Sequence, residues 1–123
     1  NPAMLEWLQR KAETASHLCS VCTGSALLAR AGLLDGRSAT TNKAAFDWVS
    51  SQGPRVNWRK QARWVEDEHC FTSSGVSAGM DMSLALISRL LDSATAQRVA
   101  TWAEYEWHRD PTWDPFAAKY GLA

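Results

Sequence analysis

The apolar positions in the first third of the chain recur first at a helical period, then in one short unbroken run, and then at a helical period again. The first helix is predicted to begin at Asn1, which can cap it, with Pro2 at its first position. An apolar run over 17–21 predicts a strand, and residues 25–30 predict a second helix that Gly32 ends. This part of the chain is therefore expected to be helix, strand, helix.

Short polar turns divide the middle of the chain into smaller elements. The pattern predicts a brief strand over 37–41 and a helix over 43–51, each next to a turn that contains glycine. Two further segments, 63–66 and 70–73, flank the polar tripeptide Asp67-Glu68-His69. Two strands around a short polar loop predict a β-hairpin.

Small residues mark a second sharp junction near the end of the chain. The segment Gly75–Gly79 is predicted to be a bend, followed by a helix over 80–91 that is apolar nearly all round and therefore buried. A last helix is predicted over 93–108. The tail beyond it is rich in proline and aromatic residues, and we expect Trp113 and Phe116 to anchor it. The whole pattern predicts alternating β and α units.

Composition restricts the class of protein. A chain of 123 residues is long enough for one domain with its own core. The 13 Lys and Arg residues balance the 13 Asp and Glu residues, so no strong field recruits nucleic acid or an anionic membrane, and a small molecule is the expected partner. No apolar stretch has the length of a membrane span, and the first residues lack a signal-peptide pattern. Three cysteines, an odd number, favour a reducing compartment, the cytoplasm.

One segment carries a pattern that also occurs in proteins that stack on nucleic-acid bases. Four basic residues surround two tryptophans: Arg55, Arg59, Lys60 and Arg63, with Trp58 and Trp64. The balanced charge of the whole chain favours the other interpretation, a solvated strand face with partly buried tryptophans.

The junction between the first strand and the second helix carries the candidate chemistry. Cys22 lies in the pentapeptide Ser20-Val21-Cys22-Thr23-Gly24, where a strand passes directly into a helix. This arrangement is typical of a nucleophile elbow, which holds one reactive side chain above the edge of a sheet. The free N–H groups and the dipole of the helix favour a thiolate there, and small residues at Ser20 and Gly24 let the turn close. The pattern predicts a cysteine-dependent enzyme or sensor, against the alternative that Cys22 only fills space.

The cysteines also allow a redox and a metal interpretation. Cys19 and Cys22 have the C-x-x-C spacing of a redox dithiol or of half a zinc site. In a strand, residues three apart point to opposite faces, which opposes a disulfide between them. A zinc site would need further ligands, for which only scattered residues are available: Cys70, His17, His69 and His108. Both interpretations are disfavoured, and neither a metal nor an organic cofactor is expected.

Two motifs resemble a known family. The stretch SVCTGSALLARAGLLDGRSATTN, which starts at Ser20, and the stretch GVSAGMDMSLAL, which starts at Gly75, resemble the ThiJ/PfpI superfamily. The fold of that superfamily is like that of class I glutamine amidotransferases. The V-C-T-G-S and G-x-x-A-G-x-D patterns are most similar to its isocyanide hydratase branch, and the ending EYEWHRDPTWDPF is similar to fungal relatives. The resemblance covers the chain from Asn1 onward.

The resemblance implies an α/β fold, a three-layer, flavodoxin-like sandwich of helices around a mostly parallel sheet. It implies that Cys22 attacks the carbon of an isocyanide and that water completes the conversion to an N-substituted formamide. Thr23 would be the second catalytic residue, with a backbone N–H and a hydroxyl near the developing charge. The substrate and oxyanion pocket would include the following residues: Gly24, Asn42, Gly75 and Val76.

Two departures from the family pattern bear on the chemistry. Asn42 stands where many relatives have a histidine, and asparagine cannot act as a base, so Cys-His chemistry is not expected. Relatives also place roughly half of the domain before the helix that here begins at Asn1, and the acidic partner of the cysteine lies in that half. Residues 1–123 are therefore expected to be the C-terminal portion of a single domain, which forms a homodimer or associates with its missing N-terminal half.

Three function classes follow. The first is a cysteine-dependent isocyanide hydratase, a lyase, in the full-length protein, with little activity expected of this segment alone. The second is a cysteine-based redox or stress sensor on the same scaffold, because an exposed thiolate oxidises readily. The third is a catalytically silent fragment that acts in assembly or interaction.

Overall fold

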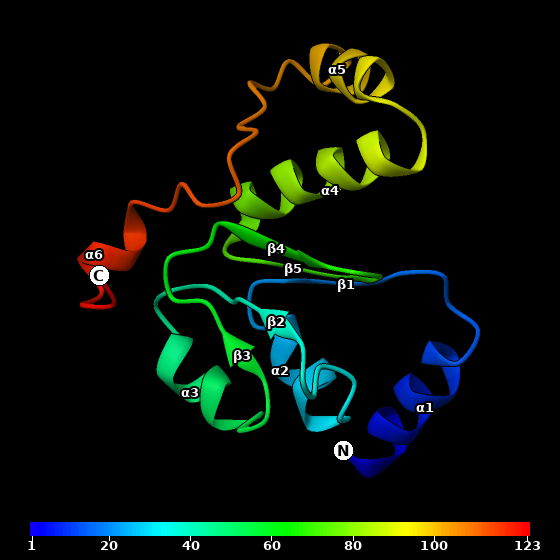
Figure 1. The fold of residues 1–123 in the computed structure, drawn as a ribbon, viewed down its shortest axis with the longest axis vertical. Helices are drawn as coiled ribbons and strands as arrows, with labels where there is room; N and C mark the ends of the chain where they lie inside the picture. The colour runs from blue at the N-terminus through cyan, green and yellow to red at the C-terminus, as the bar shows by residue number, and fades with distance from the viewer.

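The computed structural model describes all 123 residues, Asn1 to Ala123, as six helices and five strands. In chain order the elements, labelled in Figure 1, are α1 (Pro2–Ala12), β1 (Leu18–Val21), α2 (Gly24–Arg30), β2 (Ser38–Ala39), α3 (Phe46–Ser51), β3 (Asn57–Trp58), β4 (Trp64–Asp67), β5 (Cys70–Ser73), α4 (Val76–Leu90), α5 (Ser93–Trp102) and α6 (Phe116–Lys119). None of the helices combines the length and the apolar composition needed to span a membrane.

The main sheet has three strands in the order β1-β5-β4 and is mixed. β1 runs parallel to β5, with Leu18 opposite Cys70, and β4 runs antiparallel to β5, with Trp64 opposite Ser73. The short strands β2 and β3 form a separate parallel pair. Helices α4 and α5 lie on one side of the main sheet, and α2, α3 and the β2-β3 pair lie on the other (Figure 1). The predicted three-layer α/β arrangement is therefore present.

The central strand β5 contributes residues to both parts of the core, and all four of its residues are buried. Alternate residues of a strand point to opposite faces of the sheet. Cys70 belongs to one apolar cluster with Leu28 and Leu34, whereas Phe71 packs with Trp64 and Met82 in the other. Burial raises the pKa of the Cys70 thiol, so this cysteine is a core residue and a poor thiolate.

Caps and turns form where the sequence predicts them. The Asn1 side chain accepts hydrogen bonds from the N–H groups of Ala3 and Met4 at the start of α1. After α2, Gly32 and Gly36 adopt positive φ angles of 78° and 75°, at the predicted helix end and at the predicted turn. Strands β4 and β5 form the predicted hairpin.

Two elements in the middle of the chain are shorter than predicted. The strand expected over 37–41 consists only of Ser38–Ala39, and the helix expected over 43–51 begins at Phe46. The strand ends early because the N–H of Thr40 donates to the side chain of Thr72 at 2.9 Å instead of to a neighbouring strand. Local pattern does not reveal such a partner.

The predicted bend over 75–79 is wrong. Gly75 caps α4, and the helix begins at Val76. The small residues therefore serve close packing of the helix against the sheet rather than a change of chain direction. The helix is also not buried all round, because Val76, Met80 and Leu90 are exposed.

Helix α5 ends at Trp102, well before the predicted end at 108. Beyond it the chain turns, with Glu104 at a φ of 53°. The buried carboxylate of Asp81 then accepts hydrogen bonds from the Tyr105 hydroxyl and the His108 N–H, each at 2.9 Å. These tertiary hydrogen bonds outweigh the helical spacing that continues through this stretch.

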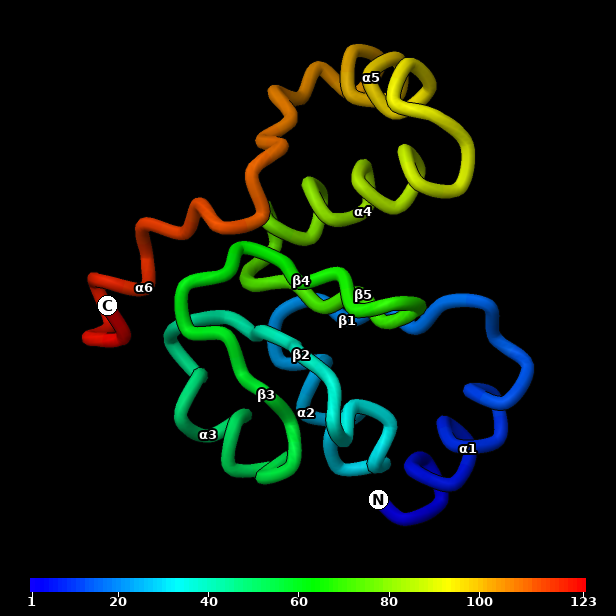
Figure 2. Tube along the Cα trace, viewed as in Figure 1, coloured from blue at the N-terminus to red at the C-terminus, as the bar shows by residue number.

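An ion pair and one of the two predicted aromatic residues attach the tail to the body. Trp113 and Phe116 are 45% and 47% exposed, so neither is buried, but the ring of Trp113 lies over the buried guanidinium of Arg63 at 5.1 Å. The carboxylate of Asp114 lies 3.1 Å from the ammonium of Lys43, and both side chains are buried. Ala117 is the buried residue of α6. Figure 2 shows the trace of the tail leaving α5 and passing the strand layer to reach α6.

Candidate functional site

The turn between β1 and α2 holds Cys22 in a strained backbone conformation. Its φ is 59°, in the left-handed region that residues other than glycine rarely adopt. Such a conformation costs about 1–3 kcal/mol and persists only where the surrounding structure enforces it. Cys22 is half-buried and stands between a strand and a helix. This is the geometry of a nucleophile elbow.

Two neighbouring segments hold the elbow from both sides. The N–H of Cys22 donates to the carbonyl of Ser74 at 2.9 Å, just beyond β5. The carbonyl of Cys22 accepts the hydroxyl of Thr41 at 2.7 Å and that of Ser25 at 3.4 Å. Thr41 is fully buried, so its hydroxyl is fixed in place. Thr41 was missed in the sequence because only the fold brings it against residue 22.

Thr23 and Gly24 follow the elbow at the start of α2. Thr23 is exposed, and its side chain makes no capping hydrogen bond to the helix. A Cβ added to Gly24 would meet the Cβ of Ser20 at 3.6 Å, which is an ordinary contact. An alanine would therefore fit at position 24, and the left-handed conformation of the turn is taken by Cys22.

Three of the predicted pocket residues line one cavity beside the elbow. Asn42, Gly75 and Val76 contribute to the lining of a cavity of about 300 Å³. Ser74, whose carbonyl binds Cys22, belongs to the same lining. The elbow residues themselves lie outside the lining. The structure thus brings the pocket residues together and joins them to the elbow through Ser74.

A buried ion pair forms another part of this lining. The Nζ of Lys43 lies 3.1 Å from a carboxylate oxygen of Asp114, and each side chain is 1% exposed. The same ammonium donates to the Thr40 hydroxyl at 2.9 Å and to the carbonyls of Thr41 and Ala62 at 2.9 and 2.7 Å. Burial lowers the pKa of Lys43, and the charge of Asp114 opposes that shift. The pair was missed because its members are far apart in the sequence.

A second buried ion pair joins the start of β4 to α4. Arg63 donates from two guanidinium nitrogens to one oxygen of Asp81, both at 2.7 Å. The other oxygen of Asp81 accepts the Tyr105 hydroxyl and the His108 N–H. Burial raises the pKa of Tyr105, and its hydrogen bond to Asp81 adds to the shift. Asp81, the last residue of the G-x-x-A-G-x-D motif, thus ties three segments together and lies outside the cavity lining.

All three cysteines are free thiols. Cys19 is exposed and Cys70 is buried, and desolvation raises the pKa of both thiols. No disulfide joins Cys19 to Cys22. No group of three or more His, Cys, Asp and Glu side chains is arranged to hold a metal ion.

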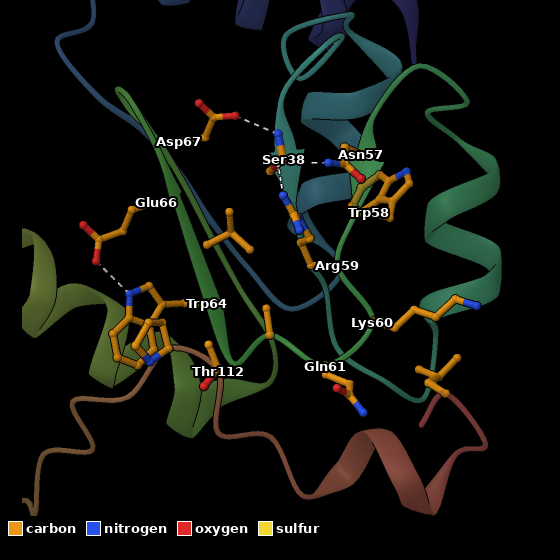
Figure 3. A pocket seen from close by; sticks show the side chains of 14 residues that line it. Ser38, Asn57, Trp58, Arg59, Lys60, Gln61, Trp64, Glu66, Asp67 and Thr112 are labelled. Atoms are coloured by element: carbon orange, nitrogen blue, oxygen red, sulfur yellow. Dashed lines mark hydrogen bonds between the residues drawn. The ribbon is translucent and has the colours of Figure 1, made fainter.

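A larger cavity of about 950 Å³ lies between the β3 region, β4 and the tail. Figure 3 shows Trp58 and Arg59 on one side of it and Trp64 on the other. Trp64 is 2% exposed and its ring N–H donates to Glu66 at 3.0 Å, while Arg63 is buried in its ion pair. The tryptophans and basic residues of this segment therefore do not form one stacking surface. No residue of the predicted site lines this cavity.

Gly79 packs directly beneath the residue that precedes the elbow. A Cβ at position 79 would lie 2.7 and 3.0 Å from the two methyl groups of Val21. We expect Gly79→Ala to lower the free energy of unfolding by about 1–3 kcal/mol through overpacking, measured by urea denaturation. Gly24→Ala, also in a helix but with room for a Cβ, is the control and is expected to change stability by less than about 0.5 kcal/mol. Equal stability of the two variants would contradict this packing.

Relatives with known names share the motif-bearing part of the chain. A family model described as the DJ-1/PfpI family matches residues 1–89. The chain is 39% identical to isonitrile hydratase of Pseudomonas putida over 101 residues, which cover 82% of this chain and 43% of that protein. Isonitrile is a synonym of isocyanide. The HTH-type transcriptional regulator GbdR of Pseudomonas aeruginosa is 42% identical over 83 residues, which cover 68% of this chain and 22% of that protein.

A solved structure shares the fold. The crystal structure of a ThiJ/PfpI family protein from Pseudomonas syringae matches with a TM-score of 0.77 at 30% identity, over 88% of this chain and 43% of that chain. This similarity confirms the predicted flavodoxin-like α/β fold. The chain spans less than half the length of both the hydratase and the solved structure.

Proposed function

Because this chain belongs to the DJ-1/PfpI family, we propose that the full-length protein is a cysteine-dependent hydratase that converts an isocyanide into an N-substituted formamide. The observation that carries the proposal is the strained elbow. Cys22 has a φ of 59°, and both its N–H and its carbonyl are bound by fixed groups. A conformation that costs free energy and is held in this way is characteristic of a reactive residue. The similarity to isonitrile hydratase supports the choice of substrate.

The reaction consists of two additions and one elimination at a single carbon. The sulfur of Cys22 bonds to the terminal carbon of the isocyanide, and the thiol proton ends on that carbon, which gives a thioimidate. Water then adds to the same carbon. One proton of the water goes to nitrogen, the C–S bond breaks, and the other proton returns to sulfur. The products are the formamide and the free thiol.

The residues around the elbow supply hydrogen bonds rather than a base. Thr23 offers a backbone N–H and an exposed hydroxyl next to the nucleophile. The side chain of Asn42 lines the cavity, and its oxygen lies 3.3 Å from the hydroxyl of Thr41, whose proton goes to the carbonyl of Cys22. An amide cannot remove a proton in this pH range, so Asn42 serves orientation and charge stabilisation.

The proposal is tested by incubating the full-length protein with benzyl isocyanide in water enriched in ¹⁸O. We expect N-benzylformamide that carries one ¹⁸O atom, detected by mass spectrometry, at a rate proportional to the protein concentration. Formamide production that does not depend on the protein, or the absence of any product, would contradict a hydratase.

The matches to transcriptional regulators favour one alternative, a cysteine-based sensor on the same scaffold. A sensor would oxidise Cys22 at low peroxide concentrations, before the other two cysteines. Peroxide titration followed by peptide mass spectrometry measures this order. Oxidation of Cys22 no faster than that of Cys19 or Cys70 would contradict the sensor.

A further inference from the structure

Thr41 is a buried polar residue that the proposed reaction does not use. It is 0% exposed, and its hydroxyl donates to the carbonyl of Cys22 at 2.7 Å. The hydroxyl of Ser25 reaches the same carbonyl only at 3.4 Å, which is beyond the usual length of an O–H···O hydrogen bond. Thr41 therefore makes the strong contact to this carbonyl.

The surroundings of Thr41 fix the position of its hydroxyl. The carbonyl of Thr41 accepts the ammonium of Lys43 at 2.9 Å, and that ammonium is paired with the buried carboxylate of Asp114. A β-branched side chain has few rotamers, and full burial leaves no room to change between them. The hydroxyl is therefore a rigid donor that is directed at residue 22.

The carbonyl of Cys22 and the N–H of Thr23 belong to one peptide unit. The chain has no cis peptide bond, so this unit is planar and trans, and its carbonyl and its N–H point in opposite directions. The N–H of Thr23 has no acceptor within the chain. A donor that fixes the carbonyl therefore also sets the direction of this free N–H, and it polarises the peptide unit so that the N–H becomes a stronger donor.

The same hydrogen bond opposes the relaxation of the elbow. Cys22 has a φ of 59°, and such a conformation persists only where the surrounding structure enforces it. On the carbonyl side of Cys22, the hydroxyl of Thr41 is the short contact that enforces it. Without this hydroxyl, the peptide unit between Cys22 and Thr23 could rotate to relieve the strain.

We propose that Thr41 is a positioning residue for the reaction at Cys22. Its hydroxyl orients the peptide unit between Cys22 and Thr23, so that the N–H of Thr23 points at the charge that forms beside the nucleophile. The inference rests on the proposed function, because it concerns the reaction that Cys22 carries out. Thr41 acts through the peptide unit and leaves the bonds that form and break unchanged.

The test measures kcat and KM for formamide formation by the full-length protein with Thr41→Val and with Thr41→Ser. Valine has nearly the shape of threonine but no hydroxyl, whereas serine keeps the hydroxyl. We expect Thr41→Val to lower kcat by about tenfold or more and to leave KM within about twofold, because the misdirected donor acts in the transition state. Thr41→Ser should recover most of kcat.

Folding is controlled in two ways. Rates are expressed per folded protein, with the folded fraction read from near-UV circular dichroism. Thr41→Ala, which removes the same hydroxyl together with the methyl group, should lower kcat as Thr41→Val does. Thr72→Val is the matched control, because Thr72 is 1% exposed and its hydroxyl accepts the N–H of Thr40 rather than contacting the elbow. This variant should lose stability but keep kcat within about twofold.

A second measurement does not require turnover. The ¹⁵N chemical shift of the Thr23 amide depends on hydrogen bonding of the carbonyl in the same peptide unit. We expect this signal to move in Thr41→Val and to keep its position in Thr41→Ser and in Thr72→Val.

Three results would overturn the proposal: a kcat of Thr41→Val within about twofold of the wild-type value, an equal loss in Thr41→Ser, or an equal loss in Thr72→Val. The outcome is separable from that of the hydratase assay. If no formamide forms, the hydratase is contradicted and the Thr23 amide signal alone decides the role of Thr41. Formamide production with an unmoved Thr23 signal in Thr41→Val contradicts the role of Thr41 alone.

Discussion

Replacing Lys43 by Met is expected to lower the free energy of unfolding by about 3–5 kcal/mol. The substitution keeps an unbranched side chain that is one atom shorter, and it removes the ammonium. It leaves the carboxylate of Asp114, which is 1% exposed, without its counter-charge in the interior. It also removes the donor of three hydrogen bonds, to Thr40, Thr41 and Ala62. The cost should appear as a lower midpoint of urea denaturation.

The exposed pair of Arg55 and Asp35 provides the matched control. These side chains are 3.9 Å apart and are 83% and 40% exposed, so Arg55→Met should change stability by less than about 1 kcal/mol. The double variant Lys43→Met with Asp114→Leu should recover part of the loss, because no unpaired charge remains buried. A cost for Lys43→Met no greater than that for Arg55→Met would show that the pair does not stabilise the fold.

The ion pair of Lys43 and Asp114 is also in contact with the candidate site. Lys43 donates to the carbonyl of Thr41, and the Thr41 hydroxyl donates to the carbonyl of Cys22. Asp114 belongs to the C-terminal tail and lines the cavity beside the elbow. One buried network thus supports the elbow on one side and the tail on the other.

The elbow was predictable because its signals are local. A run of apolar residues, one cysteine and a following helical segment are contiguous around Cys22, and short-range geometry determines how they fold. The hairpin of β4 and β5 was predictable for the same reason, since the polar tripeptide Asp67-Glu68-His69 stands between two strand-forming segments. The structure adds that Cys22 rather than Gly24 takes the left-handed conformation.

The boundaries of α4 and α5 were not predictable, because tertiary contacts decide them. Gly79 lies in a small-residue segment that favours a bend, but in the fold it lets α4 approach Val21. The helical spacing continues beyond Trp102, but the helix ends there. The Tyr105 hydroxyl and the His108 N–H donate hydrogen bonds to the carboxylate of Asp81. Neither contact has a counterpart in the neighbouring sequence.

The candidate site was predictable in part. The pocket residues Asn42, Gly75 and Val76 came from two motifs, and the fold places them around one cavity. Thr41 and the tail residues were not found, because their roles depend on segments that are distant in the sequence. Hydrogen-bonding partners of a buried hydroxyl and of a buried ammonium are properties of the fold, not of the residue.

The largest effect is expected for the replacement of Cys22 by Ser in the full-length protein. The hydroxyl of serine is a far weaker nucleophile than a thiol at neutral pH, and no residue with a basic side chain lies among the predicted site residues to activate it. The substitution changes one atom at a half-buried position, so the fold should be retained. We expect the rate of formamide formation to fall by about 10³-fold or more, as for the loss of other covalent nucleophiles.

Cys19→Ser is the matched control, because it makes the same change three residues earlier, at an exposed position of β1. This variant should keep the rate within about a factor of two. The decisive measurement is the initial rate of formamide formation from one isocyanide by the wild-type protein, Cys19→Ser and Cys22→Ser. Loss of the rate in Cys22→Ser alone is the predicted result, and equal formamide formation by Cys22→Ser and the wild-type protein would contradict the assignment of Cys22 as the nucleophile.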